Sequence, residues 1–144
     1  KNDLSHPIEI ENNHLQRWLT QEIEQKQVTI SIKTQGLFTP QMIGFKQDKG
    51  LSLKKGCYVG QEIIARTEHL GQAKRDLHHI VIQSAQAIQP GDPLIDDTKK
   101  NQGIIVQTAQ KSKETQTALA VIRISALTEK QPLYWEDNLV TIQE

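Results

Sequence analysis

The chain has 144 residues, with seventeen basic and seventeen acidic side chains and a formal net charge of zero. This length fits one ordinary domain, or the tail of a longer chain followed by one small domain. A protein that holds nucleic acid over its whole surface usually has a basic excess, because phosphate contacts supply most of the affinity. Zero net charge therefore argues against direct, tight nucleic-acid binding, although a local basic patch is compatible with it.

Cys57 is the single cysteine of the chain, which excludes an internal disulfide and a cysteine-rich metal site. A lone thiol suits a reducing cytosol. Apolar runs such as residues 118–122 are too short to cross a bilayer, and no signal-peptide pattern opens the chain. We expect a soluble, cytoplasmic protein with no membrane partner. Because the chain begins at Lys1 and not at Met, we also expect a fragment or a processed product.

The first predicted element is a helix over residues 12–26. Within it Leu15, Trp18, Leu19 and Ile23 recur at helical spacing, and the two asparagines at its start can cap its first turn. The pattern predicts that these four side chains form one apolar stripe.

Irregular chain follows this helix, and a second helix comes after it. Residues 27–32 favour a short strand or an extended arm, and residues 36–40 are irregular because Pro40 keeps its predecessor out of helical space. A helix should begin at Gln61 and end near Gly71. We expect this helix to direct Ile63, Ile64 and Ala65 toward a core.

The second half of the chain is rich in β-branched residues and turn residues. Short strands alternate with turn signals, as is typical of a small antiparallel barrel or sandwich. The sequence thus predicts an α+β fold with two domains, residues 1–72 and residues 73–144, the second a small antiparallel barrel or sandwich. The predicted strands are Leu77 to Gln83, Gly103 to Ala109, Ala118 to Ile124 and Leu139 to Ile142, separated by turns at 90–93, 99–101 and 110–114.

The densest stretch of functional residue types is 54–62, Lys-Lys-Gly-Cys-Tyr-Val-Gly-Gln-Glu. Two glycines bracket Cys57 and permit tight turns, and the predicted helix N-terminus that follows favours a thiolate. Lys54, Lys55 and Arg66 add positive charge. A reactive, partly exposed thiol is one interpretation, and the alternative is a buried cysteine that acts as a small hydrophobe.

Three histidines are candidates for a general base beside this thiol: His69, His78 and His79. His78 and His79 lie on a predicted strand with one side chain on each face, so we interpret them as partly exposed strand residues.

Residues 55–62 resemble the signature of the YgfZ family, Lys-Gly-Cys-Tyr-x-Gly-Gln-Glu. Phe38-Thr39-Pro40-Gln41 is similar to that family's Phe-(Ile/Thr)-Pro-Gln segment, and residues 63–66 are similar to its Ile-Val-Ala-Arg continuation. Lys74-Arg75 and residues 103–106 follow in the family's order. The resemblance covers nearly the whole chain, but after Gln41 an Asn-Leu-Asp-like stretch of the family is replaced by Met-Ile-Gly-Phe-Lys.

The resemblance implies a three-lobed ring like that of the glycine-cleavage T-protein, with tetrahydrofolate or another folate in a central channel. This chain would supply the last part of the folate-binding body and then the barrel, while an N-terminal lobe would supply the other wall of the site. Trp18, twenty residues before Phe38, occupies the place of a tryptophan that contacts folate; the alternative is that it packs with Leu15 and Leu19. The other implied folate contacts are Tyr58, Gln61, Glu62 and Arg66.

The resemblance also implies a function. The T-protein reads Lys-x-Asp-Phe-x-Gly where this chain has Cys57-Tyr58, which points to the YgfZ branch: a folate-dependent accessory factor for iron–sulfur enzymes and, through them, for tRNA modification. Cys57 would be the functional thiol and iron–sulfur enzymes transient partners. The alternatives are a folate-dependent aminomethyltransferase and a plain interaction or tRNA-binding module. Whether the chain catalyses a reaction stays open.

Overall fold

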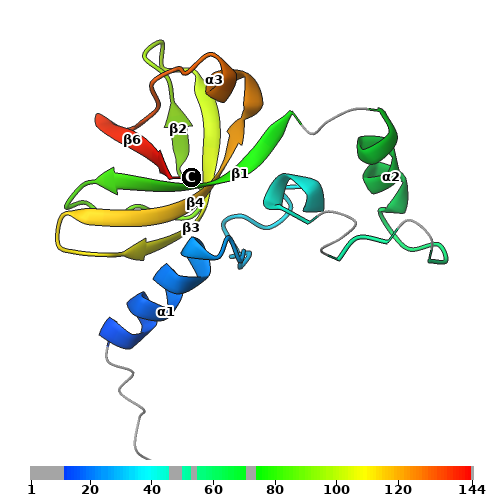
Figure 1. The fold of residues 1–144 in the computed structure, drawn as a ribbon, viewed down its shortest axis with the longest axis horizontal. Coiled ribbons are helices and arrows are strands. Elements are labelled where there is room, and N and C mark those ends of the chain that lie inside the picture. The colour runs from blue at the N-terminus through cyan, green and yellow to red at the C-terminus, as the bar shows by residue number, and fades with distance from the viewer. Residues whose placement is uncertain (1–11, 46–49, 53–54, 71–73, 144) are drawn as a thin grey trace, which may run out of the picture.

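The computed structural model describes residues 12–45, 50–52, 55–70 and 74–143, with the backbone alone at 12, 13 and 68–70. A six-stranded barrel forms the main body; α1 lies against its outside, and α2 lies away from it beyond η1 (Figure 1). No helix in these ranges combines the length and the apolar character needed to cross a membrane. The helical elements are α1 (Asn12–Glu24), η1 (Pro40–Ile43), α2 (Gln61–Leu70) and α3 (Ile124–Thr128).

The barrel is antiparallel and closed, with the strand order β1-β4-β3-β2-β5-β6. Pairing of β1 with β6, in which Ile80 lies opposite Ile142, closes the sheet on itself. Closure leaves no unpaired sheet edge. The strands are β1 (Arg75–Gln83), β2 (Pro93–Ile95), β3 (Asn101–Gln110), β4 (Thr115–Arg123), β5 (Tyr134–Trp135) and β6 (Asn138–Gln143).

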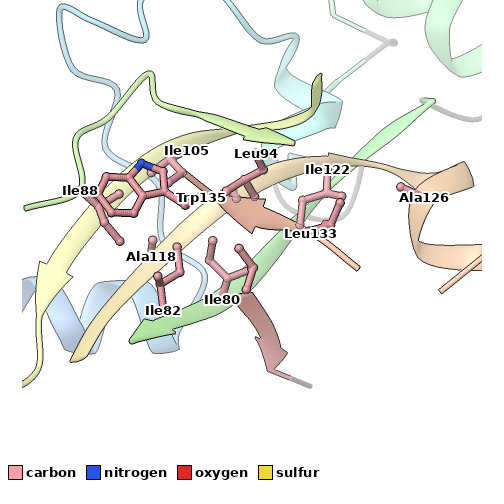
Figure 2. Close-up of a cluster of buried hydrophobic side chains, with 12 residues drawn as sticks. Ile80, Ile82, Ile88, Leu94, Ile105, Ala118, Ile122, Ala126, Leu133 and Trp135 are labelled. Carbon is pink, nitrogen blue, oxygen red and sulfur yellow. The ribbon is translucent and has the colours of Figure 1, made fainter. Parts of the chain in front are cut away.

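Alternate residues of the strands fill the interior of the barrel. Ile80, Ile105 and Leu94 are fully buried there, and Trp135 is 5% exposed. Figure 2 shows these side chains arriving from different strands and meeting in one cluster. This core needs no contribution from residues before β1.

A second apolar cluster covers the outer face of the wall that β1, β4 and β3 form. Leu77, Leu119 and Val121 face outward here and pack with Ile23 of α1, which is fully buried. Partly buried side chains that complete this cluster are Leu19, Val28, Phe38, Met42 and Ile43. The barrel wall is therefore apolar on both faces, which explains why β4 is buried along almost its whole length.

A register shift in β3 strengthens the attachment of α1. Pairing with β4 slips between Ile105 and Gln107, and such a bulge re-aims the local side chains. As a result, Val106 joins the outer cluster and its neighbour Gln107 also reaches the α1 side. The Gln107 amide accepts a hydrogen bond from the backbone N–H of Thr29 at 2.9 Å and donates one to Glu22 at 3.1 Å.

The structure confirms the α+β class and the antiparallel barrel, and the four predicted strands correspond to β1, β3, β4 and β6. Residues 27–32 form no strand. The expectation that Ile63 faces a core is wrong, because its side chain is 62% exposed, whereas Ile64 and Ala65 are partly buried. Ile63 lies on the part of α2 that no described element covers. The division at residues 72 and 73 stays a prediction.

Candidate functional site

Cys57 lies in irregular chain just before α2, and its side chain is exposed. Within the described residues, the thiol is therefore not packed as a small buried hydrophobe. Gly60 has φ +87°, a left-handed conformation that side-chain-bearing residues rarely adopt, and it turns the chain into the helix. The turn is closed by Gln61 N–H donating to the Tyr58 carbonyl at 3.2 Å and Ile64 N–H donating to Gly60 at 3.3 Å.

The charged residues around Cys57 are engaged with their own neighbours. The Lys55 ammonium lies 4.7 Å from the centroid of the Tyr58 ring, within cation–π range. Arg66 pairs with Glu62 one helical turn earlier at 2.6 Å, and both side chains are largely exposed. Exposed pairs of this kind add little stability, so Arg66 can exchange its partner for a ligand carboxylate. Lys54 lies outside the described residues.

Gln41 of η1 connects α2 to the rest of the structure. Its side-chain amide donates a hydrogen bond to the backbone carbonyl of Ile64 at 2.9 Å, and the residue is 8% exposed. The Gln41 carbonyl oxygen and the Thr39 hydroxyl are both buried without a hydrogen-bond partner. In the sequence, Gln41 stands out only as part of the Phe-Thr-Pro-Gln segment, which gives it no role of its own.

Trp18 is 53% exposed and stands outside both apolar clusters. It lines a shallow groove of about 590 Å³ between α1 and the turn joining β3 to β4, here called the Trp18 groove. The groove also contains Arg17, Glu24 and Lys111, and the Lys111 ammonium lies 3.9 Å from the Glu24 carboxylate. An exposed indole face beside charged groups suits a flat aromatic ligand that carries carboxylates.

The predicted site residues fall into two groups in the structure. Tyr58, Gln61, Glu62 and Arg66 are gathered with Cys57 on and just before α2, and Trp18 lies on α1. Figure 1 shows the two helices well apart, with η1 between them. Within the described ranges, no cluster of three or more His, Cys, Asp or Glu side chains has the arrangement of a metal site.

Of the two candidate bases on β1, His79 has a hydrogen-bond partner in the barrel wall, whereas the Nε2 of His78 is buried without one. His79 Nε2 lies 2.6 Å from the Thr117 hydroxyl, and burial lowers the His79 pKa, an effect that Glu24 partly opposes. Burial also lowers the pKa of His78. Both imidazoles therefore favour the neutral form, and the contact of His79 is structural. The side chain of His69 lies outside the described residues.

Several curated proteins are similar to this chain, all named tRNA-modifying protein YgfZ. The protein of Pectobacterium carotovorum is 38% identical over 82 residues, covering 57% of this chain and 25% of the relative. That of Cronobacter sakazakii is 30% identical over 116 residues, covering 81% and 32%. That of Colwellia psychrerythraea is 39% identical over 75 residues, covering 52% and 23%.

No protein-family model matches the chain. Among solved structures, the glycine cleavage system aminomethyltransferase T of Bartonella henselae is similar with a TM-score of 0.44 and 13% identity, over 59% of this chain and 25% of that one. The chain spans only a quarter to a third of the relatives from Pectobacterium and Cronobacter, 25% and 32% of their lengths. Over the part that aligns, the chain is a homologue of the YgfZ proteins.

Proposed function

We propose that this chain is the thiol-bearing part of a folate-binding accessory factor that supports iron–sulfur enzymes and, through them, tRNA modification. The observation that carries the proposal is the exposed thiol of Cys57, presented ahead of α2 by a segment with the family signature. The curated relatives are named as tRNA-modifying proteins.

The chemistry of a single exposed thiol fits assistance better than permanent cofactor storage. Cysteine thiolate is a natural ligand of iron in clusters and is itself redox-active. Clusters are held by several thiolates, whereas this chain has one cysteine. Any ligation by Cys57 is therefore transient and is completed by ligands from a partner enzyme or by folate.

The proposed folate contact on α1 is the ring face of Trp18. A pterin or aminobenzoate ring can stack on an indole, and Trp18 has the exposed area that stacking needs. Arg17 and Lys111 stand in the same groove and can pair with folate carboxylates. On the α2 side, Arg66 can do the same once it leaves Glu62. One folate serves both groups only if it reaches from α1 to Cys57.

Titration with tetrahydrofolate tests the binding and separates the two groups of residues. Trp18 fluorescence should change, while Trp135, which is 5% exposed and donates its ring N–H to Asp92 at 3.0 Å, serves as an unresponsive internal reference. Trp18→Phe should abolish the response, and Leu15→Ala, on the same helix and 42% exposed, is the matched control.

Bound tetrahydrofolate should also slow the alkylation of Cys57 by iodoacetamide, because a ligand beside the thiol shields it. The decrease in rate should be proportional to the fraction of protein that has folate bound. Protection of Cys57 together with a Trp18 response supports one shared site. A Trp18 response without protection restricts folate to the Trp18 groove and removes the thiol from the folate site. Absence of both contradicts folate binding by this chain.

A further inference from the structure

The position of the Cys57 segment relative to the barrel depends on a short series of contacts through η1. Met42 and Ile43 of η1 pack against the outer apolar cluster, whose members include Leu77 of β1 and Val121 of β4. Thr39 precedes η1 in extended conformation, and Gly44 follows it with φ +88°. These features hold η1 on the barrel wall, since its apolar side chains are partly buried there and both of its ends are conformationally defined.

Gln41 lies on the same turn of helix but faces the other way, toward α2. Its amide N–H holds the carbonyl of Ile64 at 2.9 Å, and η1 is in contact with α2. The Ile64 N–H is in turn bonded to Gly60, and the Gln61 N–H to Tyr58. The contacts thus run from the barrel wall through Gln41 to Ile64, and then to the turn that follows Cys57.

A second observation indicates that the side chain of Gln41 serves the hydrogen bond to Ile64 and not only packing. A buried polar side chain normally satisfies both its donor and its acceptor. Gln41 leaves its carbonyl oxygen buried and unpaired, and the Thr39 hydroxyl is likewise unpaired. An apolar residue of similar shape would avoid the cost of the unpaired oxygen, so the amide contributes here chiefly through its donor to α2.

From these contacts we infer that Gln41 is a positioning residue for Cys57: its amide docks α2 on η1 and thereby fixes where the thiol stands relative to the barrel and to Trp18. The consequence for function rests on the role proposed above for Cys57, whereas the docking of the helix does not. Loss of one such hydrogen bond should lower the ratio of docked to undocked helix by about fivefold.

A distance measurement between two spin labels tests the docking. Cys57 is the single cysteine of the chain and takes one label; the second is attached through Lys113→Cys in the exposed turn between β3 and β4. With Gln41 intact, the distance distribution should be narrow. Gln41→Met removes the donor while keeping the length of the side chain, and it should broaden the distribution.

Two further variants distinguish the loss of the hydrogen-bond donor of Gln41 from a change in side-chain packing. Thr39→Val removes the neighbouring unpaired hydroxyl and should leave the distribution narrow. Gln41→Glu should broaden it at neutral pH, because a carboxylate faces the Ile64 carbonyl, and narrow it again when acid protonates the new carboxyl into a donor. The near-ultraviolet circular dichroism of Trp135 reports in every variant that the barrel is intact.

A narrow distribution in Gln41→Met, or a broad one with Gln41 intact, would overturn the docking role. The functional consequence is read separately: tetrahydrofolate should protect Cys57 from alkylation less in Gln41→Met, while the Trp18 response is kept. A broadened distance with unchanged protection would overturn the link to function and leave the proposed folate site itself untouched. Failure of folate binding in the unaltered chain would instead concern the proposed function alone.

Discussion

Asp96 shows how one side chain organises a turn of the barrel. It follows β2, is 5% exposed, and accepts hydrogen bonds from the N–H and hydroxyl of Thr98, the N–H of Lys100 and the amide of Gln102. Hydrogen bonds from Thr98 and Gln102, with a smaller contribution from Lys100, lower the pKa of Asp96 from 3.8 to about 2. The carboxylate thus fixes the connection between β2 and β3.

A pH dependence of the free energy of unfolding follows from this lowered pKa. Because the folded state prefers the ionised form, the contribution of Asp96 is fully present above the unfolded pKa near 3.8 and is lost as pH falls toward about 2. Between these pH values, the free energy of unfolding measured with urea should change less with pH in Asp96→Asn than in the unaltered protein. Asp97→Asn, at an exposed neighbour, is the control, and an equal change with pH in all three proteins would contradict the assignment.

The sequence predicts candidate residues for the site but not the contacts that they make in the structure. The expectation of an accessible Cys57 agrees with its exposure. The pairing of Arg66 with Glu62 was not expected, although residues four apart on a helix are neighbours and carried that signal. The contact of Gln41 with Ile64 joins residues 23 positions apart, and no local pattern specifies such a pair.

At the scale of elements, α1 is attached to the barrel along one face only. Ile23 is fully buried in the outer cluster, Leu19 is partly buried, and Leu15 is 42% exposed near the beginning of the helix. The apolar stripe predicted from periodicity therefore packs in the outer cluster at the C-terminal end of α1. Its N-terminal end lies outside that cluster. Trp18, at the margin of this face, borders the Trp18 groove.

Because burial increases along α1, shortening the apolar side chains at its two ends should have unequal effects on the free energy of unfolding. Ile23→Ala should lower the free energy of unfolding by about 2–5 kcal/mol, because it leaves a cavity between α1 and the barrel wall. Leu15→Ala, at an exposed position, should change it by less than about 0.5 kcal/mol. Chemical denaturation followed by circular dichroism measures both. Similar effects for the two variants would show that α1 is not held by its buried end.

The elements that sequence reasoning missed are those too short to show a period. β2 has three residues and β5 has two, so their strand character comes from the partners that they meet. The predicted strand ending at Ile124 instead stops at Arg123, and α3 begins at Ile124. Ala126 of α3 then closes the interior core. These outcomes are set by tertiary packing and not by local propensity.

At the scale of the whole molecule, the barrel has a core of its own, and the two groups of candidate residues lie outside it. The interior core is complete within the barrel and the connections between its strands, whereas α1 and η1 add a second layer on one wall. Turn signals and alternation predicted an antiparallel barrel or sandwich. Closure through β1 and β6 depends on pairing between distant segments, which periodicity does not encode.

The proposed role of the exposed Cys57 thiol as the functional group is tested most directly in a strain that lacks its own YgfZ. The protein is expressed in this strain, and tRNA modification is measured by mass spectrometry of the nucleosides. Cys57→Ala should fail to restore modification although its circular dichroism and unfolding match those of the unaltered protein, because an exposed side chain contributes little to stability. Val59→Ala, at a fully exposed neighbour, should restore it. Full restoration by Cys57→Ala would contradict the account.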